Sequence, residues 1–251
     1  MSPNEGGDVL ATTLKLYLDE PYRAGFTTRV TAVDRGWVAL AETAFFTGGG
    51  GQPADTGYVE MGGVRYLVTG VREDADGLIW HEVGLAGIER VGAAVRGEID
   101  WARRYAFMRH HTLLHIANAV VLADQDGLIT GVQIGEETSR IDFNLEGFGR
   151  EQTRALEDRI NQVIARGLPV DAQVISEDEF RARPELVRTA SVAPPVVSGK
   201  VRVVRIEGFD AQACGGTHVR NTRELGECRI TRFDNKGKSN KRFYLMLGPA
   251  A

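Results

Sequence analysis

Two pairs of possible metal ligands stand about a hundred residues apart in this chain. His111-Thr-Leu-Leu-His115 spaces two imidazoles four residues apart, so on a helix both rings would lie on one face, about one turn apart. Cys214-Gly-Gly-Thr-His218 spaces a thiol and an imidazole in the same way, within a Gly-rich turn. The chain has five histidines and two cysteines, and these pairs use four of them. Three imidazoles and one thiolate suit zinc. We therefore predict one Zn²⁺ per chain, bound by His111, His115, Cys214 and His218.

These residues allow three other interpretations. A histidine pair at helical spacing also arises by chance, and a free cysteine is common in protein cores. Cys214 and Cys228 could form a disulfide, although nothing in the sequence indicates an oxidising compartment. A zinc peptidase needs a glutamate directly after the first histidine as general base, and Thr112 stands there instead. The joint occurrence of both pairs favours a shared metal site over these alternatives.

The elements that must position these ligands are predicted for residues 99–251. A largely buried helix is expected from about Trp101, with Asp100 as its cap, to just before Asp124. A second helix is expected from about Arg150 to Arg166, with Gly167 and Pro169 ending it. Strands are expected within 129–144 and at 170–174, 201–206, 227–233 and 242–247. This order predicts an α+β domain with helices on one face of an antiparallel sheet.

The preceding residues, 11–98, show short alternating segments and no amphipathic helix. Asp34-Arg-Gly36 and Asp74-Ala-Asp-Gly77 are typical hairpin turns between such segments. These features predict a small N-terminal β-barrel. We therefore expect a disordered tail at 1–10, a β-barrel domain with a Gly-rich loop at 11–98, and a zinc-containing domain at 99–251.

The Gly-rich loop has four consecutive glycines, Gly48 to Gly51, followed by Gln52 and Pro53. Because glycine loses more backbone entropy on folding than other residues, such a run favours a close approach to a ligand or an RNA backbone, with a flexible loop as the alternative. It is no ATPase phosphate-binding loop, since no Gly-Lys-Ser/Thr follows. Gly237-Lys-Ser239 occurs later, but Arg232 occupies the position where that motif needs glycine. ATP is therefore not an expected ligand.

Composition and charge restrict the class of protein. Hydrophobic residues make up 43% of the chain, enough for a core, and no apolar run approaches the roughly 18 residues that span a membrane. With a polar, acidic N-terminus, the sequence predicts a cytoplasmic protein without a membrane partner. The net charge is −4, yet residues 229–242 hold six basic residues and one acidic residue, a local charge of +5 (six minus one). Such a patch attracts phosphates, although a solvated charged surface is the commoner explanation.

Taken together, these motifs resemble those of the alanyl-tRNA editing proteins, in the medium form of the free-standing AlaX type. Those proteins are similar to the editing domain of alanyl-tRNA synthetase and, more distantly, to that of threonyl-tRNA synthetase. The resemblance covers nearly all of the chain after the first ten residues, and one departure is Phe46-Thr-Gly48, where the family often has a proline and a non-glycine residue before the glycines. The matching segments are Met108–His115, Arg140–Phe143, Cys214–Val219 with Asn221–Thr222, Asn235–Lys238, and the N-terminal Gly-Gly-Gly-Gln-Pro with Asp55–Gly57.

The resemblance implies a zinc-containing hydrolase that edits in trans, removing serine and also glycine from mischarged tRNA(Ala) while sparing Ala-tRNA(Ala). An RNA-binding module with a purely structural zinc is the alternative, because four protein ligands usually close a tetrahedral site. Asp142 and Asp210 are weak candidates for the general base. The expected substrate-binding residues are Thr130, Gly49, Gly50, Gly51 and Gln52. The expected tRNA-binding residues are Arg109, Lys236, Lys238, Lys241 and Arg242.

Overall fold

The structure is a computed structural model that describes residues 12–84, 91–189 and 196–250, so the predicted tail at 1–10 lies outside the described residues. The chain forms two compact units. One comprises residues 1–48 and 54–101, and the other comprises 49–53 and 102–251. The segment Gly49–Pro53 therefore belongs to the second unit, although its neighbours in sequence belong to the first.

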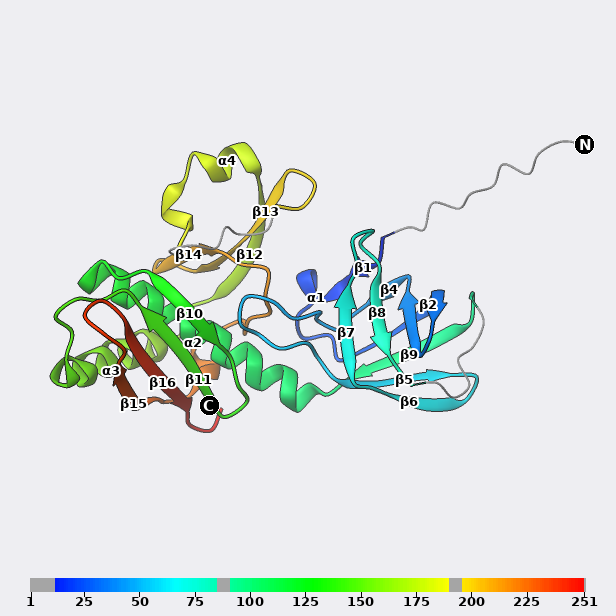
Figure 1. Cartoon of the computed structure of the whole chain (residues 1–251), viewed down its shortest axis with the longest axis horizontal. Coiled ribbons are helices and arrows are strands. Elements are labelled where there is room, and N and C mark those ends of the chain that lie inside the picture. Colours follow the sequence, from blue (N-terminus) through cyan, green and yellow to red (C-terminus); the bar gives the residue numbers. More distant parts are fainter. Residues whose placement is uncertain (1–11, 85–90, 190–195, 251) are drawn as a thin grey trace, which may run out of the picture. The chain divides into compact units, whose positions relative to one another are not determined.

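The first unit is built on a seven-stranded antiparallel sheet in the order β6-β5-β9-β2-β3-β8-β7 (Figure 1). The strand bounds are β2 Gly25–Asp34, β3 Trp37–Leu40, β5 Gly57–Met61, β6 Val64–Val68, β7 Gly70–Glu73, β8 Ile79–Glu82 and β9 Ala94–Ile99. A short helix, α1 Leu16–Asp19, and a two-residue parallel pair, β1 Leu14–Lys15 with β4 Glu42–Thr43, complete this unit. Both predicted hairpins are present, since β2 pairs with β3 and β7 pairs with β8.

Alternating burial explains why the sheet curls around a core. Every second residue of β9 is buried, and β5 shows the same period of two, so each strand has one apolar face. The aromatic rings of Phe26 and Phe45 fill the interior, with centroids 5.9 Å apart. Gly97 of β9 makes room for the first ring, because a Cβ there would lie 2.3 Å from Phe26.

A closed barrel is not confirmed, and the sheet is better described as a curled half-barrel. Its terminal strands β6 and β7 follow each other in the chain, separated by Thr69. The Thr69 backbone N–H donates to Glu82 O at 3.1 Å and its hydroxyl to Glu82 Oε2 at 2.8 Å. After β6 the chain turns at Thr69, and the next strand, β7, pairs with β8. In the described sheet, β6 and β7 are therefore the two edge strands.

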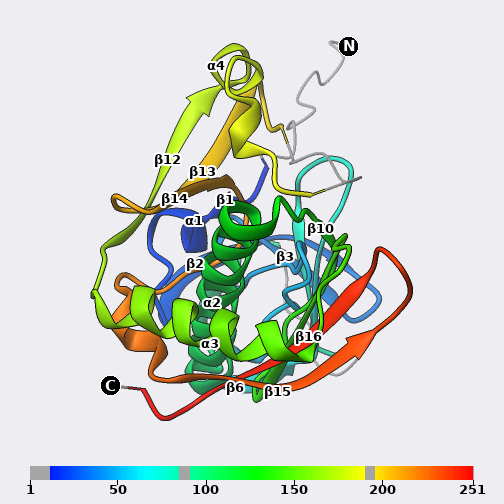
Figure 2. The same cartoon turned by 90° about the vertical axis from the view of Figure 1, so that its left-hand side faces the viewer.

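The second unit contains one long helix, α2 Trp101–Gln125, which begins and ends close to the predicted positions. Fifteen of its residues are buried, which agrees with the apolar residues on several of its faces. A four-stranded antiparallel sheet has the order β10-β11-β16-β15, with β10 Ile129–Gln133, β11 Thr138–Phe143, β15 Cys228–Asn235 and β16 Lys241–Leu247. The helix α3 Arg150–Ala165, also predicted, packs against β15 (Figure 2).

A separate three-stranded sheet leads into the turn that contains Cys214 and His218. Its order is β12-β13-β14, with β12 Val170–Ser176, β13 Lys200–Ile206 and β14 Asp210–Ala213. The short helix α4 Glu177–Arg181 sits at the end of β12, capped by Ser176 Oγ, and two 3₁₀ turns follow at η1 Pro184–Leu186 and η2 Thr222–Leu225. Among the described helices of the chain, none is long and apolar enough to cross a membrane.

Candidate metal centre

Helix α2 places His111 and His115 on one face, as their spacing predicts. Their ring centroids are 5.2 Å apart, and both side chains are buried among the apolar residues of the helix. Because both rings are packed against their neighbours, their orientations are fixed before a metal binds. Little side-chain entropy would then be lost on metal binding.

The Cys214–His218 turn follows β14 and is held by an arginine from the neighbouring strand. Arg202 Nη1 of β13 donates to the carbonyl oxygens of Cys214 and Gly216, each at 2.9 Å. Gly216 also lets the turn approach α2, because a Cβ at this position would lie 2.2 Å from His111 Cε1. The glycine in this turn is therefore explained by the close passage of a histidine ring.

The two pairs meet at one point. Cys214 Sγ lies 3.4 Å from His111 Nε2 and 3.4 Å from His218 Nε2. The His218 ring centroid lies 4.3 Å from that of His111 and 4.5 Å from that of His115. One donor atom from each of the four residues falls within 4.8 Å of all the others, so this cluster could hold one metal ion. The donor set of three nitrogens and one sulfur is consistent with zinc.

The outward nitrogens of two rings are engaged by protein groups. His218 Nδ1 lies 3.1 Å from Thr112 Oγ1, and His111 Nδ1 lies 2.9 Å from Gln52 Oε1. His115 Nδ1 is buried and has no hydrogen-bond partner among the described residues. Zinc-bound histidines usually donate their second ring nitrogen to a nearby acceptor. The contacts of His111 and His218 fit that pattern, with Nε2 directed at the cluster.

Burial also sets the protonation of the ligands. It lowers the pKa of His111 to about 3, with the Arg202 guanidinium as a smaller cause. Burial likewise holds the pKa values of His115 and His218 well below the ordinary histidine value. Near neutral pH the three imidazoles are therefore uncharged, as metal ligation requires. Burial raises the pKa of the Cys214 thiol, so its thiolate form calls for a nearby cation.

The Gly-rich loop reaches this cluster through Gln52. Within the loop, the backbone N–H groups of Gly49 and Gln52 each donate to the other's carbonyl at 3.0 Å. Gly51 O accepts from Ile134 N at 2.8 Å, and a Cβ on Gly51 would lie 2.7 Å from Val132 Cγ1. The glycines thus allow a close approach of the loop to the β10 segment, whereas the predicted approach to a ligand or an RNA backbone stays a prediction. Gly49 and Gly50 are exposed, whereas the Gln52 side chain is buried.

The two candidate general bases are both held in ion pairs. Asp142 receives a bidentate contact from Arg242, with both N–O distances at 2.8 Å. Asp210 pairs with Arg188 at 2.8 Å, and burial raises the pKa of its carboxyl. Thr130, the candidate for substrate selection, lies exposed on β10 and donates to Asn240 Oδ1 at 3.2 Å. The contacts of Asp142 and Thr130 do not involve the four candidate ligands. Asp210 is one side chain away from them, since Gln212 Nε2 donates to Asp210 Oδ2 at 2.7 Å and to the His115 carbonyl at 3.1 Å.

Three of the five expected tRNA-binding residues make contacts within the protein. Lys241 is buried, and its ammonium donates to Asn235 Oδ1 and to the carbonyls of Gly237 and Lys238 at 2.6–3.0 Å. Arg109 donates to three backbone carbonyls, those of Glu224, Leu225 and Gly248.

Arg242, the third, is paired with Asp142 as described, which leaves Lys236 and Lys238 as the exposed pair from the predicted set. The burial of Lys241 had a signal in the sequence, since it shares the inward face of β16 with Phe243 and Leu245 at a period of two.

Several supporting residues escaped the sequence analysis. Thr112 and Arg202 hold the ligand turn, and Gln212 donates to the His115 carbonyl at 3.1 Å while accepting from Asn118 Nδ2 at 3.1 Å. The contacts of Thr112 and Gln212 join residues roughly 90 or more positions apart, and those of Arg202 join β13 to the turn after β14. No pattern within a short stretch of sequence predicts such contacts.

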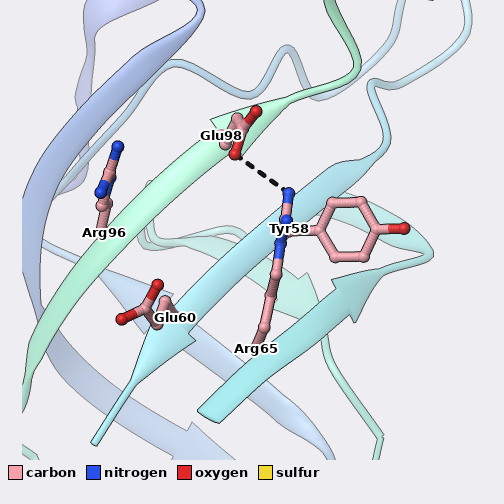
Figure 3. A pocket seen from close by; sticks show the side chains of 5 residues that line it. All are labelled: Tyr58, Glu60, Arg65, Arg96 and Glu98. Atoms are coloured by element: carbon pink, nitrogen blue, oxygen red, sulfur yellow. Dashed lines mark hydrogen bonds and ion pairs between the residues drawn. The ribbon is translucent and has the colours of Figure 1, made fainter. Parts of the chain in front are cut away.

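A polar hollow on the first unit is separate from these residues. It is lined by Tyr58, Glu60, Arg65, Arg96 and Glu98 (Figure 3). Arg65 bonds Glu98 at 3.0 Å and lies 4.0 Å from the centre of the Tyr58 ring. Its two acids and two bases balance one another, so the hollow has no net preference for an anion or a cation.

Known proteins are similar to this chain along nearly all of its length. Residues 201–244, which include Cys214 and His218, match the family described as the threonyl and alanyl tRNA synthetase second additional domain. Residues 13–103 match the class II (A) tRNA synthetases. The alanyl-tRNA editing protein AlaX-M of Saccharolobus solfataricus is 37% identical over 94% of this chain and 100% of its own length. The protein of the same name from Methanosarcina barkeri is 38% identical over 94% and 99%. The alanine–tRNA ligase of Thermococcus kodakarensis is 33% identical over 96% of this chain and 26% of the ligase.

Proposed function

Because the chain belongs to the AlaX-M family of alanyl-tRNA editing proteins, we propose that it is a deacylase that acts in trans on mischarged tRNA(Ala). Its substrates are Ser-tRNA(Ala) and Gly-tRNA(Ala), and the correct Ala-tRNA(Ala) is spared. The observation that carries the proposal is the cluster of three buried histidines and one partly buried cysteine, in a chain that matches an AlaX-M protein over 94% of its length.

The cofactor in this proposal is one Zn²⁺ per chain, held by His111, His115, Cys214 and His218. When bound, zinc supplies Lewis-acid polarisation of an oxygen or fixes the geometry of the site. Since four protein ligands are the number that closes a tetrahedral zinc site, the second of these roles, orientation, is the one we favour. The uncharged imidazoles and the cation-seeking thiol support this assignment.

The reaction is hydrolysis of an ester. Water adds to the aminoacyl carbonyl carbon, the bond from that carbon to the ribose oxygen breaks, and the ribose oxygen takes a proton. The products are the free amino acid and tRNA. Asp142 and Asp210 are poorly suited to removing the proton from water, because each is already paired with an arginine. The chain's own contribution is then to bind and orient the ester beside the cluster, whose three histidines are buried.

Selection for serine rests on its hydroxyl. A pocket with polar groups placed for that hydroxyl rejects alanine by about 10⁴-fold, because those groups would be left without partners. Thr130 stays our candidate for such a group, together with Gly49, Gly50, Gly51 and Gln52 of the loop.

Binding of the tRNA is assigned to the exposed lysines at the turn between β15 and β16. Lys236 and Lys238 lie there, and among the described residues the acidic partner of this pair is Asp234, whose Oδ2 lies 3.6 Å from Lys236 Nζ. A long Nζ–Oδ2 distance at an exposed site leaves this ammonium available for a phosphate.

The test compares release of labelled serine, glycine and alanine from tRNA(Ala) by the zinc-loaded protein. We expect fast release of serine and release of alanine slower by orders of magnitude, and we expect glycine, which also lacks the hydroxyl, to be released more slowly than serine. Equal rates for serine and alanine would contradict the proposal.

The alternative is an RNA-binding module with a structural metal, which the closed four-ligand set favours. That reading predicts tRNA binding by the zinc-loaded protein with no release of any of the three amino acids. The same assay therefore separates the two functions.

A further inference from the structure

The side chain of Gln52 is the contact between the Gly-rich loop and the ligand cluster. It is 2% exposed, and all three of its hydrogen bonds go to residues of the second unit. Oε1 lies 2.9 Å from His111 Nδ1 and 3.3 Å from Thr217 N, while Nε2 lies 2.9 Å from Thr217 Oγ1. Every polar atom of this buried amide is therefore used.

These contacts determine which atom donates in the hydrogen bond between Gln52 and His111. A backbone N–H can only donate, so the amide atom that faces Thr217 N must be the oxygen. That oxygen is also the partner of His111 Nδ1, which must then be the protonated nitrogen. The lone pair of His111 is left on Nε2, the atom that lies 3.4 Å from Cys214 Sγ. Gln52 thus selects the tautomer that can ligate a metal within this cluster.

The partner of His218 is held differently. Thr112 lies on α2 itself, one residue after His111, and its hydroxyl donates to Met108 O at 3.0 Å within the same helix. That contact forms whenever the helix forms. Gln52 instead lies 59 positions before His111, at the end of four glycines, and it reaches the ring only when the loop is docked.

Docking of the loop has few other anchors. Gly49, Gly50 and Gly51 have φ values of +135°, +59° and +85°, and a Cβ on either of the first two would meet nothing within 4 Å. The contacts of Gly51 with β10 and those of Gln52 hold the segment in place. A flexible run anchored at a few atoms costs backbone entropy to order, so anything that strengthens one anchor shifts its population.

We propose that Gln52 is a positioning residue for the ligand His111, so that metal binding and docking of the Gly49–Pro53 loop strengthen each other. This inference rests on the proposed metal site and goes beyond it, because the loop becomes part of the metal site rather than only of the substrate pocket. Coupling between two binding events is reciprocal. Metal therefore orders the loop, and the docked loop tightens the metal.

The first experiment measures zinc affinity by competition with a chromophoric chelator. Gln52→Met keeps the side-chain length and removes all three hydrogen bonds, and we expect zinc affinity about 10–100-fold weaker than in the wild type. Gln52→Glu keeps an acceptor for His111 Nδ1–H, and we expect its affinity to stay close to that of the wild type. Gln173→Met, on β12, is the matched control with unchanged affinity. Circular dichroism checks that each variant is folded.

Zinc affinity that is retained in Gln52→Glu and lost in Gln52→Met shows that Gln52 positions His111. A side chain needed only for packing could be replaced by methionine as well. If Gln52→Met bound zinc as tightly as the wild type and changed only the KM for the charged tRNA, Gln52 would be a substrate contact and the inference would be overturned. A wild-type chain that takes up no zinc would remove the proposed metal site together with this inference. Full zinc affinity in Gln52→Met removes the inference alone.

The second experiment follows the loop directly. Hydrogen exchange of the backbone amides of Gly49, Gln52 and Ile134, which bond across and beneath the loop, is compared with and without zinc. We expect slower exchange in the zinc-loaded wild type and no such slowing in zinc-saturated Gln52→Met. Equal protection of these amides in the zinc-free and zinc-loaded wild type would show that loop and metal are independent.

Discussion

Thr112 and His218 lie 106 positions apart and meet with Thr112 Oγ1 at 3.1 Å from His218 Nδ1. The same oxygen accepts from Val219 N at 3.3 Å and donates to Met108 O at 3.0 Å. With its own proton given to Met108, the hydroxyl can only accept from the ring. His218 is therefore protonated on Nδ1, and its Nε2 is free to ligate. One threonine on α2 thus ties the second ligand pair to the helix that carries the first.

We expect Thr112→Val to weaken zinc binding about tenfold, because the isosteric side chain leaves two buried N–H groups without an acceptor. The free energy of unfolding should fall by about 1–3 kcal/mol for the same reason. Chelator competition and denaturant unfolding measure the two effects. Thr112→Ser keeps the hydroxyl and should preserve zinc affinity. If serine and valine were equally damaging, packing of the threonine methyl group would explain the effect instead of the hydrogen bond.

The four-ligand assignment predicts that Cys214→Ala loses most of its zinc, because three neutral imidazoles hold the ion less tightly than three imidazoles and a thiolate. Metal content of the purified protein measures this. His110→Ala is the neighbouring control, since successive side chains on a helix differ by about 100° in direction and His110 is not a member of the cluster. Full zinc occupancy in Cys214→Ala would contradict the assignment.

The charge prediction concerns Lys236 and Lys238. Replacing both by alanine should reduce the slope of log K for tRNA binding against log salt by about two, because each lost phosphate contact removes about one released counterion. Lys200→Ala, at an exposed position on β13, serves as the control with an unchanged slope. An unchanged slope in the double variant would place the tRNA contacts elsewhere.

Lys241→Met should behave differently from those variants. Its ammonium is buried in the β15–β16 hairpin, so we expect a loss of stability as the main effect.

A pH effect is expected in the first unit from His81. Burial lowers the pKa of this histidine to about 4, and its ring nitrogens contact Thr43 Oγ1 at 2.8 Å and Val38 O at 3.3 Å. Between pH 4 and the ordinary histidine value of about 6.5, the unfolded chain binds this proton and the folded chain does not. Stability therefore rises with pH across that window, is complete above it, and is lost as the pH falls towards 4.

The pH effect is measured by denaturant unfolding at pH 5 and pH 7. The difference between the two pH values should be smaller in His81→Phe than in the wild type by about 2 kcal/mol, from the size of one pKa unit. The histidines of the second unit contribute equally to both proteins, so they cancel in this comparison. An identical pH dependence in the variant would show that His81 is not the group responsible.

Local spacing by itself determined the two pairs of candidate ligands and the elements that carry them. The helical repeat puts His111 and His115 on one face wherever that helix forms, and a tight glycine turn brings Cys214 near His218. Because both constraints act within five residues, they hold before any tertiary contact exists. The bounds of α2 and α3 follow from caps, glycines and apolar periodicity in the same way.

The tertiary structure decided which partner each charged or polar side chain contacts. Asp142 meets Arg242 because β11 and β16 pair in one particular register, and Lys241 turns inward in that same register. Gln52 reaches His111 because the loop crosses β10, and the open half-barrel follows from the path at Thr69. Such contacts join residues far apart in the chain. Their formation depends on how strands align, and a side chain's type and its neighbours in sequence do not specify that alignment.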